Sequence, residues 1–463
     1  MCTTRADHGL HPGRGQEAKL KKPKHMIKND REVLVVGAGP VGLFTALSLA
    51  KRGVRVGVVD TGSRAATHSY ALALHPQTLE LLEGTGISEN MFGQVYPVHR
   101  MGFYDGASRR CELDLREKSG AAWPYLAAVS QSALEDLLEK ELQKFGVDVL
   151  WRHDASSFTE DRDRVSTAIS RFEKEARGYA VAHTEWVVAE TQVVSVPYLV
   201  GADGHSSRVR RALNLDFPEV GPAAYFAVFE FKSDMDLQNE MRIVLQDNST
   251  SVLWPLPGGY VRWSFQLPGY TDHDAEALKD NLFAAGFGYF PTKRPKDRSI
   301  QSGAGGEPLL QEAHLRELLA ERAPWFSGSV GEFSWRTMVR FERRQTTGFG
   351  RGRMWLAGDA AHVTMPAGVQ SMNLGLFEGH DLALALSRIL ASGASAPKEL
   401  KMYNDRWMSE WRQLHHTEGG LQPRQGADPW VKANLNRLLP CLPAHGGELI
   451  RLAGQLNLDV VLG

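Results

Sequence analysis

Cysteine is scarce in this sequence of 463 residues, which contains only three. Cys2, Cys111 and Cys441 lie far apart along the chain. They show neither the paired spacing of a disulfide framework nor the close clustering of a zinc site. We therefore predict no metal centre and no disulfide, and this cysteine usage favours a cytoplasmic location.

An excess of charge of one sign is also missing. The 53 lysines and arginines balance 54 aspartates and glutamates, which leaves a formal net charge of −1. Phosphate backbones are bound by strongly basic surfaces, so the balance argues against a nucleic-acid partner. No uncharged apolar run approaches the roughly 18 residues of a membrane span, and we expect no transmembrane segment.

The first residues of the chain lack the features of a folded segment. Residues 1–30 are polar, contain glycine and proline, and are basic from Lys19 to Lys24. They have no apolar stretch of the kind found in a secretory signal. We expect residues 1–30 to be a disordered leader or tag. The remaining length is typical of two or three folded domains.

The first strong pattern is a βαβ unit of about 30 residues. An apolar strand is predicted over 32–36, followed by a glycine-rich turn and a helix that ends at Gly53. A second apolar strand is predicted over 54–59 and ends at Asp60. Short apolar runs without alternation are typical of parallel strands that are buried on both faces.

Each residue of the turn has its own physical reason. Gly37 allows a tight turn, Gly39 lets a pyrophosphate approach the backbone, and Gly42 lets helix and strand pack closely. The free amides at the helix start favour a phosphate. Asp60 can accept hydrogen bonds from ribose hydroxyls. The unit therefore predicts dinucleotide binding, although it does not choose between NAD and FAD.

The rest of the chain alternates between helical and strand patterns. Residues 223–270 are rich in aromatic and β-branched types between turn residues, which predicts an antiparallel sheet with one covered face. The charged stretch 160–175 is expected to form an exposed turn. Helices are predicted over residues 132–145, 274–286, 309–322, 378–390 and 399–414, with only short helices after them.

Two further motifs follow the glycine turn in the chain. One runs from Gly201 to Arg210 and contains Asp203-Gly204; the other is Gly358-Asp359-Ala360-Ala361-His362, followed by a loop with Pro366 and Gly368. In this order and spacing the three motifs resemble those of the class A flavoprotein monooxygenases, the p-hydroxybenzoate hydroxylase-like family of FAD-dependent aromatic hydroxylases. The resemblance covers residues 31–415.

The resemblance implies an α/β fold, in which a Rossmann-like FAD-binding domain carries an inserted antiparallel-sheet substrate domain and C-terminal helices. The expected division is FAD-binding domain over 31–215, including the DG motif; substrate-binding sheet over 216–330; FAD-binding domain again over 331–398; and C-terminal helical region over 399–463.

The resemblance also implies which residues hold the cofactor. Asp359 would bind hydroxyls of FAD, Gln131 would touch the flavin side chain, and helix amides after the loop would favour negative charge on the reduced ring. The cofactor-binding residues expected are Gly37, Gly39, Pro40, Val41, Gly42, Asp60, Tyr70, Gln131, Asp203, Gly204, Gly358, Asp359, Pro366, Gly368, Met372 and Asn373.

Three places depart from the family pattern. Tyr70 stands where an arginine is usual, and a tyrosine cannot make the bidentate contact of a guanidinium. Val369-Gln370-Ser371 replaces a glycine-rich stretch before Met-Asn. Glu378-Gly379-His380-Asp381 stands where Asp-Ala-x-Asn is common. These departures bear on how NAD(P)H docks and how the flavin moves.

In the family, NADPH or NADH reduces FAD, O2 then gives a C4a-hydroperoxide, and one oxygen passes to an activated aromatic ring, usually a phenol. No catalytic side chain is assigned beyond the loop candidates Pro366 and Gly368. Residues expected to line the substrate pocket are Tyr225, Phe229, Trp254, Arg262 and Trp263, although strand alternation puts Arg262 and Trp263 on opposite faces.

Other interpretations remain open at this point. A flavin-dependent halogenase would need a Trp-x-Trp-x-Ile-Pro segment and an essential lysine, and neither pattern is found. An alkene epoxidase or a catalytically silent flavin-binding protein are the closer alternatives. Only one dinucleotide turn is visible, so NAD(P)H is expected to bind transiently near the flavin. The expected partners are a small aromatic substrate and O2, for a monomer or homodimer.

Overall fold

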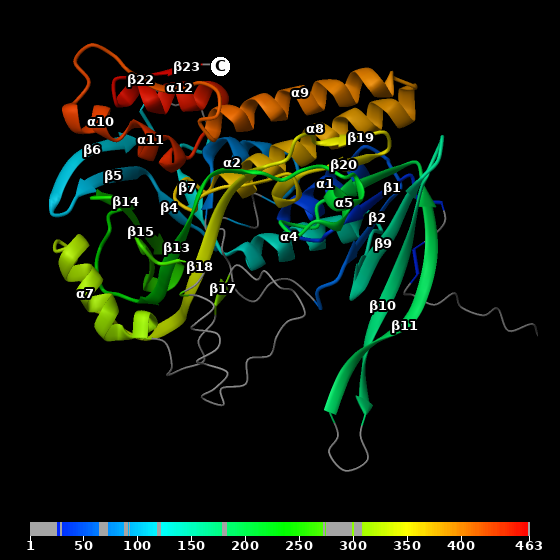
Figure 1. The fold of residues 1–463 in the computed structure, drawn as a ribbon, viewed down its shortest axis with the longest axis horizontal. Helices are drawn as coiled ribbons and strands as arrows, with labels where there is room; N and C mark the ends of the chain where they lie inside the picture. The colour runs from blue at the N-terminus through cyan, green and yellow to red at the C-terminus, as the bar shows by residue number, and fades with distance from the viewer. Residues whose placement is uncertain are drawn as a thin grey trace, which may run out of the picture.

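The computed structural model describes residues 26–27, 30–63, 73–87, 91, 93–117, 122–177, 183–271, 274, 299–300 and 308–461. Its first layer is a six-stranded sheet in the order β19-β20-β12-β1-β2-β8, parallel except for β19 (Figure 1). The strands are β1 Val33–Val36, β2 Val56–Asp60, β8 Val149–Trp151, β12 Tyr198–Gly201, β19 Gly350–Arg351 and β20 Met354–Leu356.

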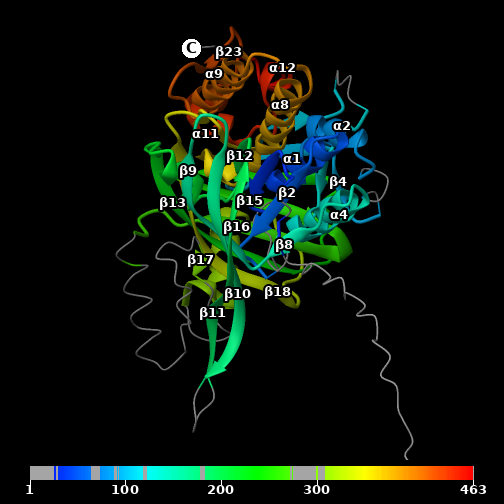
Figure 2. The same ribbon diagram turned by 90° about the vertical axis from the view of Figure 1, so that its right-hand side faces the viewer.

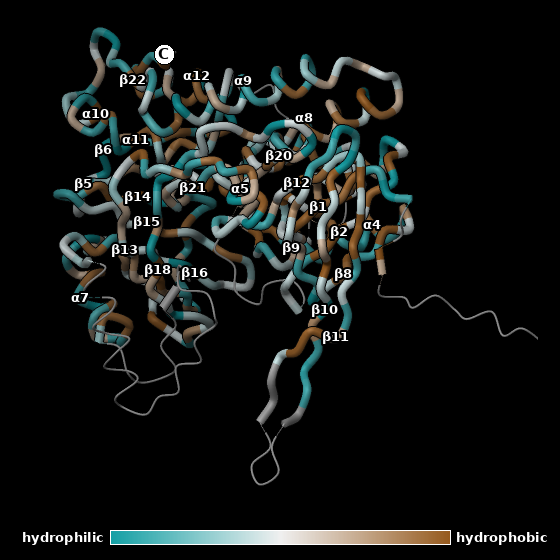
Figure 3. Tube along the Cα trace, turned by 45° about the vertical axis from the view of Figure 1, so that its right-hand side comes forward, coloured by the Kyte–Doolittle hydropathy of each residue, from teal (hydrophilic) through white to brown (hydrophobic). Residues whose placement is uncertain are grey.

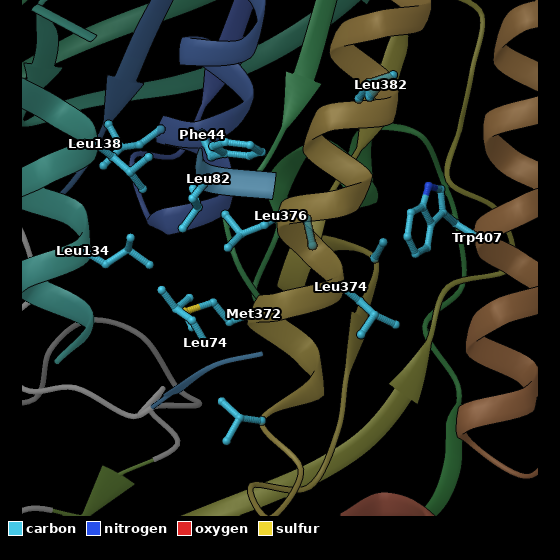
Figure 4. Close-up of a cluster of buried hydrophobic side chains, with 14 of the residues drawn as sticks. Phe44, Leu74, Leu82, Leu134, Leu138, Met372, Leu374, Leu376, Leu382 and Trp407 are labelled. Carbon is cyan, nitrogen blue, oxygen red and sulfur yellow. The ribbon is translucent and has the colours of Figure 1, made fainter. Parts of the chain in front are cut away.

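Hydrophobic residues gather along the central strands of this sheet (Figure 3), and every residue of β1 is buried. Helices pack beside the sheet and bury a cluster that includes Phe44, Leu138, Leu376 and Trp407 (Figure 4). The helices are α1 Pro40–Lys51, α4 Gln131–Lys144, α8 Gln370–Ser392 and α9 Ala396–Leu414. The βαβ unit and the later helices therefore form one core, as expected for an α/β fold.

A second, larger sheet has the order β17-β18-β13-β16-β15-β14-β5-β6, and β21 pairs with β18. Its strands are β5 Arg100–Asp105, β6 Ser108–Asp114, β13 Glu219–Lys232, β14 Glu240–Gln246, β15 Ser249–Leu256, β16 Tyr260–Gln266, β17 Ser299–Ile300, β18 Phe333–Gln345 and β21 His362–Val363. Aromatic residues such as Phe229 and Trp263 fill the space between one face of the sheet and helix α7, Glu312–Arg322.

This sheet takes strands from outside the segment 216–330. β5 pairs in parallel with β14, and β18 pairs along β13. Both strands lie in stretches that the family resemblance assigns to the FAD-binding domain. Pairing between strands that are far apart in the chain depends on packing, and the periodicity within either strand does not predict its partner.

The expectation of an exposed turn over 160–175 is wrong. A three-stranded sheet contains β9 His153–Glu160, β10 Val165–Arg177 and β11 His183–Val196, and the last two form a long hairpin that projects from the body (Figures 1 and 2). Val165, Thr167 and Ile169 alternate inward and are buried, and the charged residues lie on either side of this stretch, at 160–164 and 171–175. Ile27, within the expected leader, is also buried, and its backbone exchanges two hydrogen bonds with Gln192 on β11.

Shorter elements complete the fold. The expected helix over 274–286 falls almost entirely outside the described residues, and the helix predicted from residue 378 begins earlier, at Gln370. The C-terminal region contains a strand pair that was not predicted. The remaining elements are β3 Ala73–Leu74, α2 Pro76–Glu83, β4 Tyr96–Val98, β7 Leu126–Ala128, α5 Arg208–Ala212, β22 Gly420–Pro423, α10 Pro429–Ala433, α11 Leu435–Leu438, α12 Gly446–Gln455 and β23 Leu458–Val461, with 3-10 turns at Pro257–Gly259, Pro308–Leu310, Gly358–Ala360 and Leu439–Cys441.

In the part of the chain that the structure describes, no helix is both long and apolar enough to cross a membrane.

Candidate functional site

Three cavities that share lining residues lead from the carboxyl ends of the first sheet to the second sheet. The outer cavity, about 580 Å³, is bordered by Asp60 and Asp203 at the ends of β2 and β12. The middle cavity, about 280 Å³, shares Gly39 and Gly204 with it. The inner cavity, about 20 Å³, opens against the second sheet and shares four residues with the middle cavity: Val339, Phe341, Pro366 and Val369.

The glycine turn lies where the outer and middle cavities meet. A Cβ on Gly37, whose φ is +108°, would overlap the carbonyl oxygen of Ala202, and a Cβ on Gly42 would overlap that of Gly37. A Cβ on Gly39 would meet nothing within 4 Å. Two glycines are thus required by packing. The third leaves the cavity wall open beside the start of α1, where no side chain caps the helix.

Asp60 is fixed at the edge of the outer cavity. Its Oδ2 accepts the amide of Ala38 at 2.7 Å and its Oδ1 accepts that of Gly62 at 2.6 Å. A carboxylate has about four lone-pair sites, so these two bonds orient the group and leave acceptor capacity toward the cavity.

The DG motif forms a capped turn before α5. Asp203 accepts hydrogen bonds from Ser207 Oγ at 2.5 Å and from the amides of Arg208 and Val209 at 2.6 and 3.2 Å. Burial raises the pKa of Asp203, and these hydrogen bonds oppose the rise. Its carboxylate therefore shapes the turn, and Gly204, at φ +74°, faces the outer and middle cavities.

Arg210 ties this turn to the second motif. Its Nη1 donates to the carbonyl of Ala360 and its Nη2 to that of His205, both at 2.7 Å. The guanidinium carbon lies 3.8 Å from the ring centroid of Phe217. The two cofactor motifs are therefore held in fixed relation by one buried side chain.

Asp359 follows β20 and lines the middle cavity. Its Oδ1 accepts a hydrogen bond from Ser371 Oγ at 2.7 Å, and Ser371 lies in the first turn of α8. No side chain caps this end of α8, and Ser371 and Met372 border the same cavity. The cavity thus receives both a carboxylate and the positive end of a long helix dipole.

Glu378 holds the GD turn from behind. Its Oε2 accepts the amide of Gly358 at 2.8 Å, and its Oε1 accepts Trp411 Nε1 at 2.6 Å and His362 Nε2 at 2.8 Å. The side chains of Glu378 and His362 are 0% exposed, and the His362 ring stacks on Trp411 with centroids 3.7 Å apart. The departure from the family pattern at residue 378 therefore lies in a completely buried network.

Gly368 and Asn373 make contacts with the protein itself and do not line these cavities. A Cβ on Gly368 would come within 2.6 Å of the carbonyl oxygen of Pro440. Asn373 donates to the carbonyls of Ala73 and Val369 at 2.9 and 2.7 Å and accepts the amide of His75 at 2.8 Å.

His75 was not singled out from the sequence, although it contacts both Asn373 and Gly368. Its Nε2 donates to the carbonyl of Gly368 at 2.8 Å. Burial lowers the pKa of His75 to about 3, so the ring is neutral at neutral pH. The only signal in the sequence is a histidine directly before Pro76, which begins α2.

The remaining predicted cofactor contacts are divided. Pro40, Val41, Gln131, Pro366 and Met372 border the middle cavity. Gly358 lies just behind it, in the turn that Glu378 holds. Tyr70 lies outside the described residues.

The substrate candidates fall on two faces of the second sheet. Trp254 and Arg262, cross-strand neighbours on β15 and β16, line the inner cavity. Arg262 pairs with Glu230 at 2.5 Å and lies 5.0 Å from the centroid of Trp335. Tyr225 is directed away from the cavity and contacts Tyr270, with ring centroids 5.0 Å apart.

Phe229 and Trp263 also face away from the cavities, into the core beneath α7. Sequence reasoning missed the inner-cavity residues of β18, namely Trp335, Val339 and Phe341. The alternation of apolar and polar residues in this segment is typical of a strand. Which face of β18 borders the site, however, depends on its pairing with β13.

The glycine turn and the two later motifs form a cradle at the carboxyl ends of parallel strands, open to a second sheet, which is typical of a dinucleotide-binding fold. The chain matches the family described as "FAD binding domain" over residues 30–414, and it belongs to that family. FAD is accordingly the cofactor of this fold.

Among curated relatives, 6-methylpretetramide 4-monooxygenase of Streptomyces rimosus is 29% identical over 368 residues, which cover 78% of this chain and 57% of that protein. The uncharacterized aromatic compound monooxygenase YhjG of Bacillus subtilis (strain 168) is 27% identical over 376 residues, covering 81% and 64%. The chain thus spans about three fifths of the length of these relatives. The crystal structure of p-nitrophenol 4-monooxygenase from Pseudomonas putida DLL-E4 matches with a TM-score of 0.62 and 22% identity, covering 89% of this chain and 93% of that one, which shows a shared fold.

Proposed function

We propose that this protein is an FAD-dependent monooxygenase that uses NADPH or NADH and O2 to hydroxylate a phenolic or otherwise activated aromatic small molecule. The observation that carries the proposal is the continuous row of cavities. It leads from the dinucleotide turn at Gly39, past Asp359, to an aromatic wall at Trp254 and Trp335.

The residues of the row fit FAD. The open side of Gly39 and the first amides of α1 suit a pyrophosphate, and Asp60 suits a ribose. Asp359 would accept hydrogen bonds from hydroxyls of the flavin side chain, in a position set by Ser371. When bound, FAD supplies the acceptor for hydride from NAD(P)H and the reaction with O2. The first turn of α8 would favour negative charge on the ring edge beside it.

The aromatic wall suggests how a substrate ring would be held. Val228, Val252, Trp254 and Phe341 line the inner cavity. A planar ring that reaches this wall from the middle cavity can stack on the tryptophan and phenylalanine faces. Because Arg262 is already paired with Glu230 at 2.5 Å, the wall offers little net positive charge. A neutral phenol therefore suits it better than an aromatic carboxylate, which requires an unpaired cation.

NAD(P)H would bind transiently on the surface near the flavin, since the sequence contains one dinucleotide turn and the family assigns that turn to FAD. We also propose a cytoplasmic location. Its support is the sparse cysteine usage together with Cys111 and Cys441, the two described cysteines, which are both free thiols.

The test begins with protein reconstituted with FAD. A panel of neutral phenols and matched phenolic acids is supplied with NADPH or NADH, while oxygen consumption, peroxide and products are measured. The proposal predicts a product heavier by one oxygen atom, labelled from ¹⁸O2, with less peroxide than in the substrate-free reaction. Protein that refolds with excess FAD but retains none, or that yields peroxide alone with every ring, would exclude the activity. An epoxide formed only from alkenes would favour the epoxidase instead.

A further inference from the structure

Val369 has an unusual backbone conformation. It precedes α8 with φ +49° and ψ +34°, in the left-handed region. Among the described non-glycine residues with positive φ, it is the only one branched at Cβ. A branched Cβ crowds the backbone there, so valine is one of the residues least suited to this conformation.

The surrounding structure imposes this conformation. The carbonyl of Val369 accepts a hydrogen bond from Asn373 Nδ2 at 2.7 Å, and its amide donates to Pro366 O at 3.3 Å. Gln370 Nε2 donates to the carbonyls of Leu439 and Leu442 at 3.3 and 3.0 Å. A glycine would adopt the same backbone without strain. The reason for a valine must therefore lie in its side chain.

The side chain of Val369 lies at the passage between two cavities. Val369 borders both the middle and the inner cavity, together with Val339, Phe341 and Pro366, and is 9% exposed. These four apolar residues are shared by the two cavities. Val369 is the one whose side chain is maintained at the expense of backbone strain.

We propose that Val369 is a specificity-determining residue, which narrows the passage between the flavin cavity and the aromatic wall. This inference rests on the proposed function. A slender single ring reaches the flavin edge past the isopropyl group, whereas a wide fused ring is excluded. The same group closes the passage to water once a fitting ring is in place. Removal of its methyl groups relaxes the width limit and loosens the seal.

The experiment compares Val369→Gly, Val369→Ala and the matched control Val244→Ala, which shortens a buried valine of the core beneath α7 that lines none of the three cavities. Anaerobic titration with phenol and with 2-naphthol, followed by the flavin absorbance change, gives two dissociation constants. We expect the naphthol-to-phenol ratio to fall about tenfold in both Val369 variants, the range for one or two methylene-sized contacts. With phenol as substrate, the Val369 variants should release more peroxide per NAD(P)H oxidised than the wild type does. The control should keep the wild-type ratio.

Thermal unfolding of the FAD-free proteins tests the backbone argument separately. Val369→Gly should be more stable than Val369→Ala, because only glycine relieves the left-handed strain, whereas in an ordinary helix or strand alanine is the better residue. The reverse order would overturn the strain argument. If the wild-type protein hydroxylates phenol but the naphthol-to-phenol ratio is unchanged in both variants, the proposed role of Val369 is wrong and the proposed function stands. If the flavin-loaded wild-type protein binds no aromatic compound, both the proposed function and the role of Val369 are wrong.

Discussion

Substitution of Glu378 by glutamine tests how the cofactor cradle is built. The side chain accepts hydrogen bonds from Gly358 N, Trp411 Nε1 and His362 Nε2 at 2.6–2.8 Å and is 0% exposed. Glutamine has nearly the same size but carries one acceptor oxygen and one donor group. Whichever way the amide turns, at least one buried donor then faces another donor.

The magnitude follows from the burial of this network. A buried donor without a partner costs about 1–3 kcal/mol. We expect a loss of about 3 kcal/mol in folding stability. Because the Gly358 amide adjoins Asp359, about 1–2 kcal/mol of this should appear as weaker FAD binding, a factor of about 5–30 in the dissociation constant.

The assay measures two quantities, the melting temperature of the FAD-free protein and the FAD dissociation constant by flavin fluorescence. Glu378→Asp keeps the charge on a shorter side chain and should lose less. Glu418→Gln, in the half-exposed pair with Arg412, should change neither quantity because such pairs contribute about 0–1 kcal/mol. If Glu378→Gln matches wild type in both, the turn at Gly358 is held by other contacts and the reasoning fails.

Further predictions concern the cofactor, acid stability and the nicotinamide. Purified protein should be yellow, with FAD released intact on denaturation; covalently retained flavin or FMN would contradict this. Asp359→Ala should weaken FAD binding by about 1–3 kcal/mol and Ser371→Ala by less, measured by fluorescence titration; equal constants for Asp359→Ala and wild type would remove the carboxylate from the site. Burial lowers the pKa values of His75 and His415 to about 3 and of His445 to about 4, below the usual 6.5, so the unfolded chain binds more protons in acid. The free energy of unfolding should therefore fall as the pH drops from 6.5 toward 4, by up to about 4 kcal/mol per pH unit for the three histidines together. Thermal melts at several pH values measure this loss. Because no enclosed site for it is expected, NAD(P)H should bind with a dissociation constant of roughly tens of micromolar or weaker. Anaerobic stopped-flow should show slow flavin reduction until an aromatic ligand is added. Fast reduction without that ligand would indicate a simple flavin reductase.

The βαβ unit could be predicted because its signals are local. Gly37 and Gly42 are positions where a Cβ would overlap a backbone carbonyl, so the close approach requires a glycine that can be read directly in the sequence. The same holds for the α4 helix, whose leucine spacing and Ser130 cap are contained in one segment. Together with two short motifs in order, these signals were sufficient for the family and its cofactor.

Other features depended on residues that are distant in the chain. β5 and β18 join the second sheet through partners more than 100 residues away, and the face on which Tyr225 lies follows from that pairing. The pairing of β10 with β11 was obscured because the charged residues on either side of Val165–Ser170 resemble those of an exposed turn.

The contacts behind the site are of the same kind. Glu378 departs from the family pattern in the sequence, but it anchors the GD turn only because β21 and α9 bring His362 and Trp411 against it. Val369 departs from a glycine-rich stretch in the sequence, but its left-handed backbone follows only from contacts with Asn373 and of its neighbours with the 439–442 segment. Periodicity and turn chemistry are properties of neighbouring residues, whereas hydrogen-bond partners, buried faces and cavities arise when separate segments pack together.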